Sequence, residues 1–433
     1  MKYDLIVAGA GPGGLMAART AAADGLKVLL FDRKRDITRI TRACSQIFYI
    51  KKLSPSGDDT RASRARSDGY IDPVSVEAMP DKTVFRFHTP GFSLDYTGQA
   101  RPYLNWMHIS PVGNIVHRYR PNERIWGFYY NKETFVEGLL ADVQKAGVEV
   151  RAETMGLGAE NVPGGVRVRL RTKAGEETVE GQAAIAADGL QSHIAESAGL
   201  NAKRQFLGAS GRAFLQYVLE GVETDYPSCS WLTWLIPSLN PYGFIAMGQS
   251  EEDRCKLGSL TAGGKNPEDI LVAFMKHPKW AQMFKNARVV KKEAMGGKAA
   301  TYGPIKEPVA GNVVVVGDAG APAETWIQGA VACGYQAVKA IEKELGGQSG
   351  YPGYIAWWQQ AFAFNTPDYI KMITNLYPLP RICSDEEIDY VYGLCRNEIG
   401  IPQKMVGAKL DIIRAERPDL YERLRRSKPG EKL

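Results

Sequence analysis

The chain has 433 residues, of which 44% are hydrophobic and 24% charged, a composition typical of a globular protein of roughly two to three domains. Its net charge of +6 is spread along the chain, which argues against a nucleic-acid-binding protein. The six cysteines form no C-x-x-C pair or zinc-like cluster, and no apolar run approaches the ~18 residues of a membrane span. With no leader-like start, we expect a cytoplasmic setting.

The first predicted elements are a strand over 2–8, a glycine-rich turn, a helix to about Ala23 and a second strand over 27–31. In this pattern Gly9 allows a tight turn, Gly11 lets the backbone approach a pyrophosphate, and Gly14 lets the helix lie close to the sheet. Asp32 ends the second strand, where a carboxylate accepts hydrogen bonds from ribose hydroxyls. The stretch therefore predicts a dinucleotide site made of Gly9, Gly11, Gly13, Gly14, Asp32 and Arg33.

The middle of the chain predicts further strands and one helix. Polar residues 54–69 indicate an exposed loop, and apolar segments within 82–120 indicate strands. Apolar residues at helical spacing predict a helix over 131–147, and "GVRVRLRTKAGEETVEG" predicts a hairpin. Residues 205–295 carry aromatic side chains and further strands, which suits a sheet above a substrate cavity.

Two further strand ends carry glycine and aspartate. An apolar strand over 183–187 is followed by Asp188 and Gly189, and "NVVVVGDAGAP" places Gly317 and Asp318 after another strand. A long helix is predicted from about Gln328, with Gly329 at a close-packing position. One extended FAD explains this spacing: the N-terminal turn holds its adenosine diphosphate end, and Gly317-Asp318 holds its ribityl chain and ring.

These three motifs, in this order, resemble the FAD fold of para-hydroxybenzoate hydroxylase over roughly residues 1–345. Within that superfamily the chain is most similar to the geranylgeranyl reductase family. The features that carry this resemblance are Cys44 after the Asp32 strand, "AMGGKAATYGPIKEP" before the Gly-Asp strand, "WLTWLIP" at 231–237 and a helical tail rich in Trp and Tyr. Two departures are Leu232 and Ile236, where the family carries Tyr and Phe. A third is Trp326 and its neighbours, where the family carries glycines.

The resemblance implies an α/β (α+β) fold with three parts. The Rossmann-like FAD-binding domain would take residues 1–80, 131–204 and 296–345. A β-sheet substrate domain would take 81–130 and 205–295, and a helical region 346–433.

The activity implied is hydride transfer from reduced FAD to carbon–carbon double bonds of an isoprenoid or other lipid. No second nucleotide motif follows a strand, so electrons would come from NAD(P)H, a ferredoxin or a flavoprotein. Two alternatives remain: a monooxygenase or halogenase acting on an aromatic compound, and a non-enzymatic binder such as the Rab GDP-dissociation inhibitors. "TWLIP" also partly matches a halogenase signature.

The candidate catalytic residues are Cys44, Trp234 and Trp326. Cys44 would position the flavin or donate a proton. Trp231 and Trp234 lie three apart on a strand and so point to opposite faces, and we favour Trp234 as the one that lines the cavity. Tyr302 and Glu324 are further candidate proton donors, whereas the five histidines lie in no motif. An amphipathic segment over 410–424, followed by basic residues, suits either peripheral membrane contact or, as we favour, an ordinary terminal helix.

Overall fold

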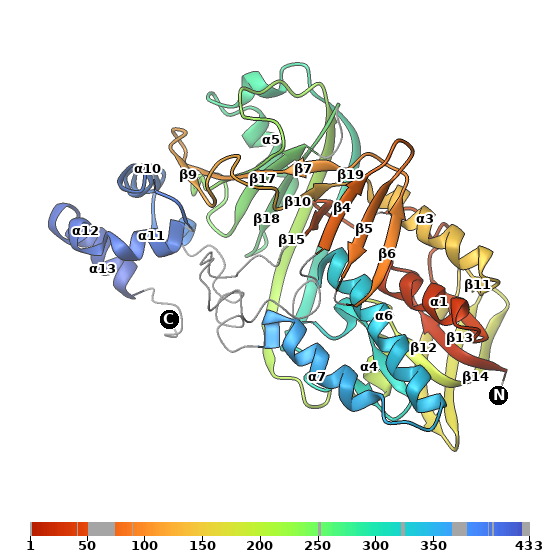
Figure 1. Ribbon diagram of the computed structural model, residues 1–433. Helices are drawn as coiled ribbons and strands as arrows, with labels where there is room; N and C mark the ends of the chain where they lie inside the picture. The colour runs from red at the N-terminus through yellow and green to blue at the C-terminus, as the bar shows by residue number, and fades with distance from the viewer. Residues whose placement is uncertain are drawn as a thin grey trace.

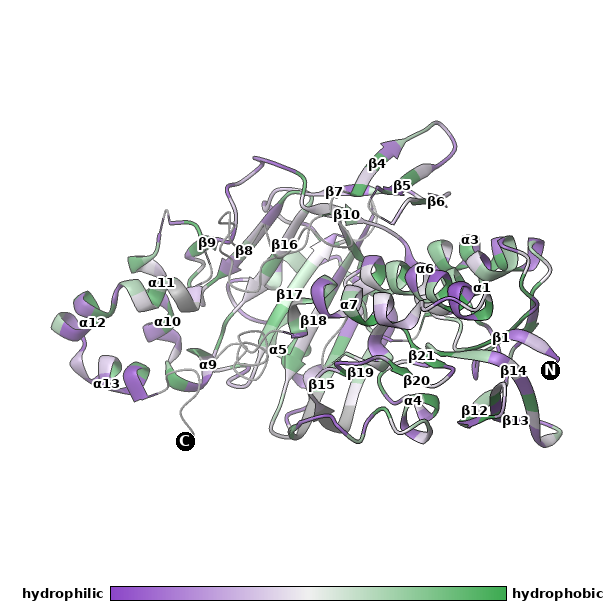
Figure 2. Ribbon diagram, turned by 60° about the horizontal axis from the view of Figure 1, so that its bottom comes forward, coloured by the Kyte–Doolittle hydropathy of each residue, from purple (hydrophilic) through white to green (hydrophobic). Residues whose placement is uncertain are grey.

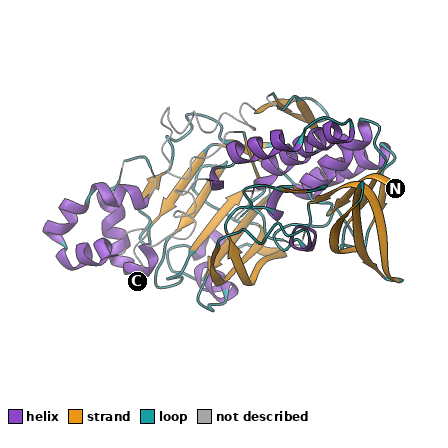
Figure 3. Ribbon diagram, turned by 90° about the horizontal axis from the view of Figure 1, so that it is seen from below, coloured by secondary structure: helices purple, strands orange, loops and turns teal. Residues whose placement is uncertain are grey.

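The computed structural model describes residues 2–40, 42–50, 74–88, 90–249, 253–321, 325–365, 379–396, 398–400 and 402–426. The loop predicted over 54–69 and the candidate Glu324 lie outside these residues. In the described part, sheets and helices near the N-terminus join a second large sheet, and the last helices gather at the end of the molecule opposite the N-terminus (Figures 1 and 3).

The first sheet contains the predicted nucleotide-binding strands. Along its centre, β1 pairs in parallel with β2 on one side and with β14 on the other, and β14 pairs in parallel with β21. The predicted hairpin is present as the antiparallel pair β13–β14. The strands are β1 (Tyr3–Ala8), β2 (Val28–Phe31), β11 (Glu149–Arg151), β12 (Met155–Val162), β13 (Gly165–Thr172), β14 (Gly175–Ala186), β20 (Val309–Ala310) and β21 (Val313–Val315).

The central strands are apolar on both sides because both faces of the sheet are covered. Leu5, Val7 and Ile185 face one hydrophobic core, which they share with three long helices. Ile6 and Ala184 face a second core, completed by β12, β13 and a short helix. The helices are α1 (Pro12–Ala23), α3 (Lys132–Lys145), α6 (Trp326–Leu345) and α4 (His193–Ser197).

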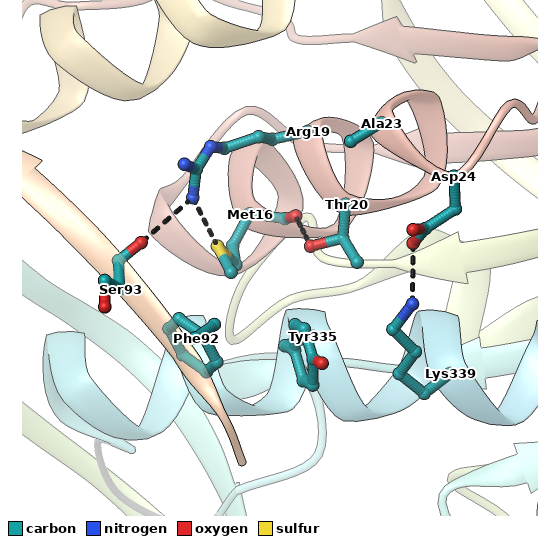
Figure 4. A pocket seen from close by; sticks show the side chains of 9 residues that line it. All are labelled: Met16, Arg19, Thr20, Ala23, Asp24, Phe92, Ser93, Tyr335 and Lys339. Carbon is teal, nitrogen blue, oxygen red and sulfur yellow. Dashed lines mark hydrogen bonds and ion pairs between the residues drawn. The ribbon is translucent and has the colours of Figure 1, made fainter. Parts of the chain in front are cut away.

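Helices α1 and α6 lie side by side because glycine allows close approach. A Cβ added to Gly334 of α6 would lie 2.2 Å from the carbonyl oxygen of Gly13 in α1, so only glycine fits there. Beside this contact the two helices and β6 surround a shallow hollow (Figure 4). Its cations are already ion-paired: Arg19 with Asp142 and Lys339 with Asp24.

A small sheet of β4 (Val74–Ala78), β5 (Thr83–Phe87) and β6 (Phe92–Tyr96) adds to the first core. Phe85, Leu94 and Tyr96 pack in the same cluster as the three long helices. The strands predicted within 82–120 are present. Residues 83–96, however, pack with the elements of the predicted FAD-binding domain rather than with the substrate sheet, to which the sequence assigned them.

The second large sheet has the order β19-β15-β18-β17-β16-β8-β9. Its longest pair is β15 with β19, antiparallel from Phe206 opposite Tyr302 to Glu220 opposite Arg288. Its strands are β8 (Asn105–Ile109), β9 (Ile115–His117), β15 (Phe206–Glu220), β16 (Ser230–Trp234), β17 (Phe244–Gln249), β18 (Arg254–Thr261) and β19 (Arg288–Tyr302).

The two faces of the second sheet have different neighbours. Helix α5 (Pro267–Met275) and the short helix η1 (Ala281–Phe284) complete a hydrophobic core on one face. On the other face, Trp106 and Trp231 pack against an aromatic cluster of the three-stranded sheet β3-β10-β7. These strands are β3 (Ile47–Tyr49), β7 (Arg101–Tyr103) and β10 (Gly127–Tyr129).

The helical C-terminal region has two parts. Helix α7 (Tyr351–Ala361) packs in the first core, whereas the later helices form a core of their own with Val116 and Leu235. These helices are α9 (Leu379–Ile382), α10 (Asp385–Leu394), α11 (Pro402–Ala408), α12 (Leu410–Glu416) and α13 (Pro418–Arg426). Figure 2 shows that part of α13 is hydrophilic. Within the described ranges, each helix is too short or too polar to cross a bilayer.

Candidate cofactor and substrate site

The glycine and aspartate motifs follow strands that are neighbours in the first sheet. β2, β1, β14 and β21 are parallel and adjacent, so Asp32, Gly9, Asp188 and Gly317 all follow strands at the same edge. A Cβ on Gly9 would lie 2.4 Å from the carbonyl oxygen of Ala187, and the φ of Gly9 is +97°. The segments predicted to serve one ligand therefore come together.

Asp32 holds the glycine-rich turn in place. Its Oδ2 accepts a hydrogen bond from the backbone N–H of Ala10 at 2.8 Å, and its Oδ1 accepts one from the N–H of Lys34 at 2.8 Å. Each carboxylate oxygen keeps a further lone pair for a ligand hydroxyl. Arg33, the next residue, is exposed beside this edge.

The turn leaves open space in front of α1. A Cβ on Gly11 would meet no atom within 4 Å, and the same is true of Gly189, whose φ is +86°. Gly11 is the N-cap of α1, and no side chain caps that helix end. The free N–H groups and the positive end of the helix therefore face a space suited to an anionic group. Gly13 and Gly14 serve packing instead: their added Cβ atoms would lie 2.7 Å from Val316 Cγ1 and 1.9 Å from the Gly9 oxygen.

Asp318 links the Gly-Asp turn to the segment that carries Cys44. Its Oδ1 accepts hydrogen bonds from the N–H and the hydroxyl of Thr325, at 2.8 and 2.9 Å, just before α6. Its Oδ2 accepts one from Nη1 of Arg42 at 3.1 Å. The neighbouring Ala43 donates its N–H to the carbonyl oxygen of Ala294 in β19. Cys44 therefore follows a segment that contacts both the Gly-Asp turn of the first sheet and β19 of the second.

The Cys44 side chain is partly exposed and carries a free thiol. Nζ of Lys132, at the start of α3, lies 4.0 Å from its Sγ. Its carbonyl oxygen accepts hydrogen bonds from Gln216 and Lys256 of the second sheet. Sequence patterns gave no sign of these partners, because they lie on separate strands far from Cys44 in the chain.

Trp326 begins α6 in an unusual conformation. Its φ of +58° is left-handed, which is uncommon for a residue with a side chain. Its ring lies 4.7 Å from that of Tyr49, which is in the strand that follows Cys44. The helix starts at Trp326, earlier than the predicted Gln328. Gly329 does not face the predicted cofactor site, because a Cβ added to it would lie 2.9 Å from the ring of Phe362.

Two polar side chains near these motifs have buried atoms without a hydrogen-bond partner among the described residues. They are the amide of Gln328, with both its nitrogen and its oxygen, and Oδ1 of Asp188. Burial raises the pKa of Asp188. Buried polar atoms seldom stay unpaired, so both indicate a polar ligand. With the open space at Gly11 and the uncapped helix end, these residues fit FAD.

The second sheet reverses one prediction. Trp234 is fully buried on the α5 face, with its ring 4.9 Å from that of Phe274 and 5.7 Å from that of Trp280. Strand registers place Trp231 on the opposite face, which also carries Lys256 and Gln216. Trp231 is therefore the tryptophan on the Cys44 side, and we leave Trp234 out of the site proposed below.

Of the other candidates, Tyr302 makes an edge-to-face contact with Phe206 and lies under the guanidinium of Arg204 at the far end of the β15–β19 pair. His108 is buried, and neither of its ring nitrogens has a hydrogen-bond partner among the described residues. Burial, with a contribution from Arg118, lowers the pKa of His108 to about 3. His108 is therefore neutral at physiological pH.

Comparison with known proteins identifies related sequences. No protein-family model matches the chain. Digeranylgeranylglycerophospholipid reductases of Methanocella arvoryzae and Methanothrix thermoacetophila are each 25% identical to it over 322 residues, covering 74% of this chain and 71% of theirs. A digeranylgeranylglycerophospholipid reductase of Methanococcoides burtonii is 23% identical over 409 residues, covering 90% of this chain and 86% of its own. The chain is a homologue of the geranylgeranyl reductases.

Solved structures share the fold of this geranylgeranyl reductase homologue. A geranylgeranyl bacteriochlorophyll reductase-like protein from Thermoplasma acidophilum matches with a TM-score of 0.63 at 19% identity, covering 98% of both chains. The halogenase PltM in complex with FAD matches with a TM-score of 0.61 at 15% identity, covering 99% of this chain and 87% of that one. The chain therefore shares its α/β fold with these proteins, which confirms the predicted fold class.

Proposed function

We propose that this geranylgeranyl reductase homologue is an FAD-dependent enzyme that reduces carbon–carbon double bonds in the isoprenoid chains of a lipid. The named relatives, which are reductases of a geranylgeranyl lipid, support the substrate class. The observation that carries the proposal is the Arg42–Asp318 contact, which ties the segment of Cys44 to the Gly-Asp turn. The segment that carries the free thiol of Cys44 and the predicted ring-binding turn are thereby held together.

The residues of the site have separate roles in this reaction. The N-terminus of α1, opened by Gly11, binds the pyrophosphate, while Asp32 and Asp318 accept hydrogen bonds from cofactor hydroxyls. The chemistry that reduced FAD would supply here is a hydride for the double bond. Cys44 holds the proton that the neighbouring carbon needs, and the Lys132 ammonium stabilises the charge left on Sγ. Trp326 and Tyr49, whose rings lie 4.7 Å apart, would cover the space next to the Gly-Asp turn.

A single anaerobic turnover tests this function. The flavin is reduced with dithionite, a digeranylgeranyl glycerophospholipid is added, and products are weighed by mass spectrometry. We expect products heavier by two hydrogens per double bond, together with flavin reoxidation. An unchanged lipid with flavin that stays reduced would overturn the proposal. Product formation from an aromatic compound only with oxygen would favour a monooxygenase or halogenase. Purified protein that stays colourless with added FAD would favour a non-enzymatic binder.

The same assay separates the candidate electron donors. The described residues contain one glycine-rich turn of the dinucleotide type, which the proposal assigns to FAD. Electrons therefore come from NAD(P)H, a ferredoxin or a flavoprotein that binds transiently. Replacing dithionite by each donor in turn identifies the one that supports repeated turnover.

The sequence by itself favours an ordinary terminal helix over 410–424, but a lipid substrate has to be reached at a membrane. We therefore also propose peripheral contact between the C-terminal helices and an anionic membrane. Helix α13 ends in three arginines. Arg423 donates hydrogen bonds to Glu387 and to the carbonyl of Ile382, so it holds α13 to its neighbours. Arg425→Glu with Arg426→Glu is therefore the better test. We expect these substitutions to reduce co-sedimentation with anionic vesicles while the melting temperature is kept; equal co-sedimentation would favour an ordinary terminal helix.

A further inference from the structure

The second sheet buries an ion pair directly beneath the segment of Cys44. Lys256 of β18 and Glu293 of β19 have side chains only 4% and 1% exposed, and Nζ lies 3.2 Å from Oε2. Lys291 of β19 contacts Oε1 of the same glutamate, also at 3.2 Å. Burial lowers the pKa of Lys256, and the Glu293 carboxylate opposes this shift. Each charge of the pair therefore depends on the other.

The ammonium of Lys256 has three hydrogens, and each has an acceptor. One is Oε2 of Glu293, and the second is the carbonyl oxygen of Cys44 at 3.3 Å. The third is the side-chain oxygen of Gln46 at 2.7 Å, in the amide orientation that also lets its nitrogen donate to the carbonyl of Tyr130 at 2.9 Å. Two of the three acceptors therefore belong to the turn of Cys44.

Gln216 of β15 completes the arrangement. Its amide nitrogen donates to the carbonyl oxygen of Cys44 at 3.1 Å and to Oε2 of Glu293 at 2.8 Å. The Cys44 carbonyl thus accepts from two donors, one of them charged. Two residues on, Gln46 has a left-handed φ of +53°, a conformation that costs free energy and persists only where its surroundings hold it. The network supplies that restraint.

A buried ion pair is weak evidence for stability, because apolar residues of similar volume often serve the fold as well. This pair has a specific geometric effect: it fixes the backbone on both sides of Ser45. We propose that Lys256, Glu293 and Gln216 are positioning residues that hold the Cys44 turn and thereby set where its thiol lies. Only the importance of that thiol for turnover rests on the proposed function.

Thiol reactivity tests the inference without substrate. The wild-type protein, Lys256→Met, Glu293→Gln and the double variant are treated with iodoacetamide, and alkylation of each cysteine is followed by peptide mass spectrometry. Cys229 and Cys255, which are also partly exposed, serve as internal references. Lys292→Met is the matched control, because Lys292 is the neighbouring lysine of β19 and its ion pair with Glu268 is exposed.

We expect each single variant to lower the melting temperature, because Glu293→Gln leaves the Lys256 ammonium without its carboxylate and Lys256→Met leaves Glu293 with Lys291 as its remaining ion-pair partner. The double variant should recover part of that loss. The rate of Cys44 alkylation should change by at least tenfold in the single and the double variants, with Cys229 within twofold of wild type. Lys292→Met should change neither the melting temperature nor the rate of Cys44 alkylation. Restoration of both the wild-type melting temperature and the wild-type Cys44 rate in the double variant would overturn the inference.

Gln216→Met removes one hydrogen-bond donor to the Cys44 carbonyl without leaving a charge unpaired. It therefore tests the same inference if the charge variants do not fold. We expect Gln216→Met to change the rate of Cys44 alkylation in the same direction as the charge variants do. An unchanged rate would count against a positioning role for Gln216. The rates of Cys44 alkylation do not depend on whether the protein reduces a lipid, so they test the positioning role even if the proposed lipid reduction fails. The two proposals therefore fail separately.

Discussion

The glycines of the first turn look alike in the sequence but differ in what surrounds them. Gly14 touches the backbone of Gly9, whereas Gly11 faces open space. Sequence spacing predicted that this turn binds a nucleotide. It could not separate Gly13, which packs against Val316 and against Ala330 of α6, from Gly11, because that distinction depends on where α6 crosses α1.

Substitution should separate the binding glycine from a packing glycine. We expect Gly11→Val to keep the melting temperature of the FAD-free protein but to weaken FAD binding at least tenfold, about 1.4 kcal/mol, because the side chain fills the space for the pyrophosphate. Gly14→Ala should instead lower stability by roughly 1–3 kcal/mol through overpacking. Thermal melts and quenching of flavin fluorescence measure the two effects. Wild-type FAD affinity in Gly11→Val would contradict this assignment.

At the scale of elements, most helices and strands could be predicted, and the start of α6 shows why some boundaries could not. The helix begins at Trp326, and the acceptor for the N–H of the preceding Thr325 is Asp318, seven positions upstream. Capping patterns read neighbouring residues, so a cap supplied by a folded loop leaves no local signal. The left-handed conformation of Trp326 could not be predicted for the same reason.

This helix start predicts an unusual order of stabilities. Trp326→Gly and Trp326→Ala both lose the contact with Tyr49, but only glycine adopts a φ near +58° without cost. We expect the glycine variant to be more stable than the alanine variant by about 1 kcal/mol, the reverse of the usual helix preference. Urea unfolding measures the difference. Greater stability of the alanine variant would show that the left-handed conformation is not retained.

At the scale of the whole molecule, the order of the elements and the meeting of the three motifs at one sheet edge could be predicted. Which face of the second sheet lies toward Cys44 could not be predicted. The sequence shows that Trp231 and Trp234 point to opposite sides. Choosing between them requires knowing that α5 covers the Trp234 side, and the Lys256–Glu293 pair needs the strand registers as well.

His108 links global stability to pH. Its pKa falls from 6.5 to about 3 on folding, so between these values the unfolded chain binds a proton that the folded protein does not. This contribution to stability is complete above about pH 6.5 and is lost by roughly 1.4 kcal/mol for each pH unit below it. His108→Met should therefore lose less stability than the wild type between pH 7 and pH 5. If urea unfolding gave equal losses of stability for the variant and the wild type, groups other than His108 would account for the acid sensitivity.

The parallel pairing of the first sheet also bears on how the protein is made. β1 is synthesised first, yet its partner β14 lies at 175–186, and the α6 that packs on α1 ends only at Leu345. At ribosomal rates this gap lasts on the order of tens of seconds. Throughout that time the apolar side of α1 stays uncovered by its final neighbour. The nascent nucleotide-binding half is therefore a natural client for chaperones and becomes competent for its cofactor only late in translation.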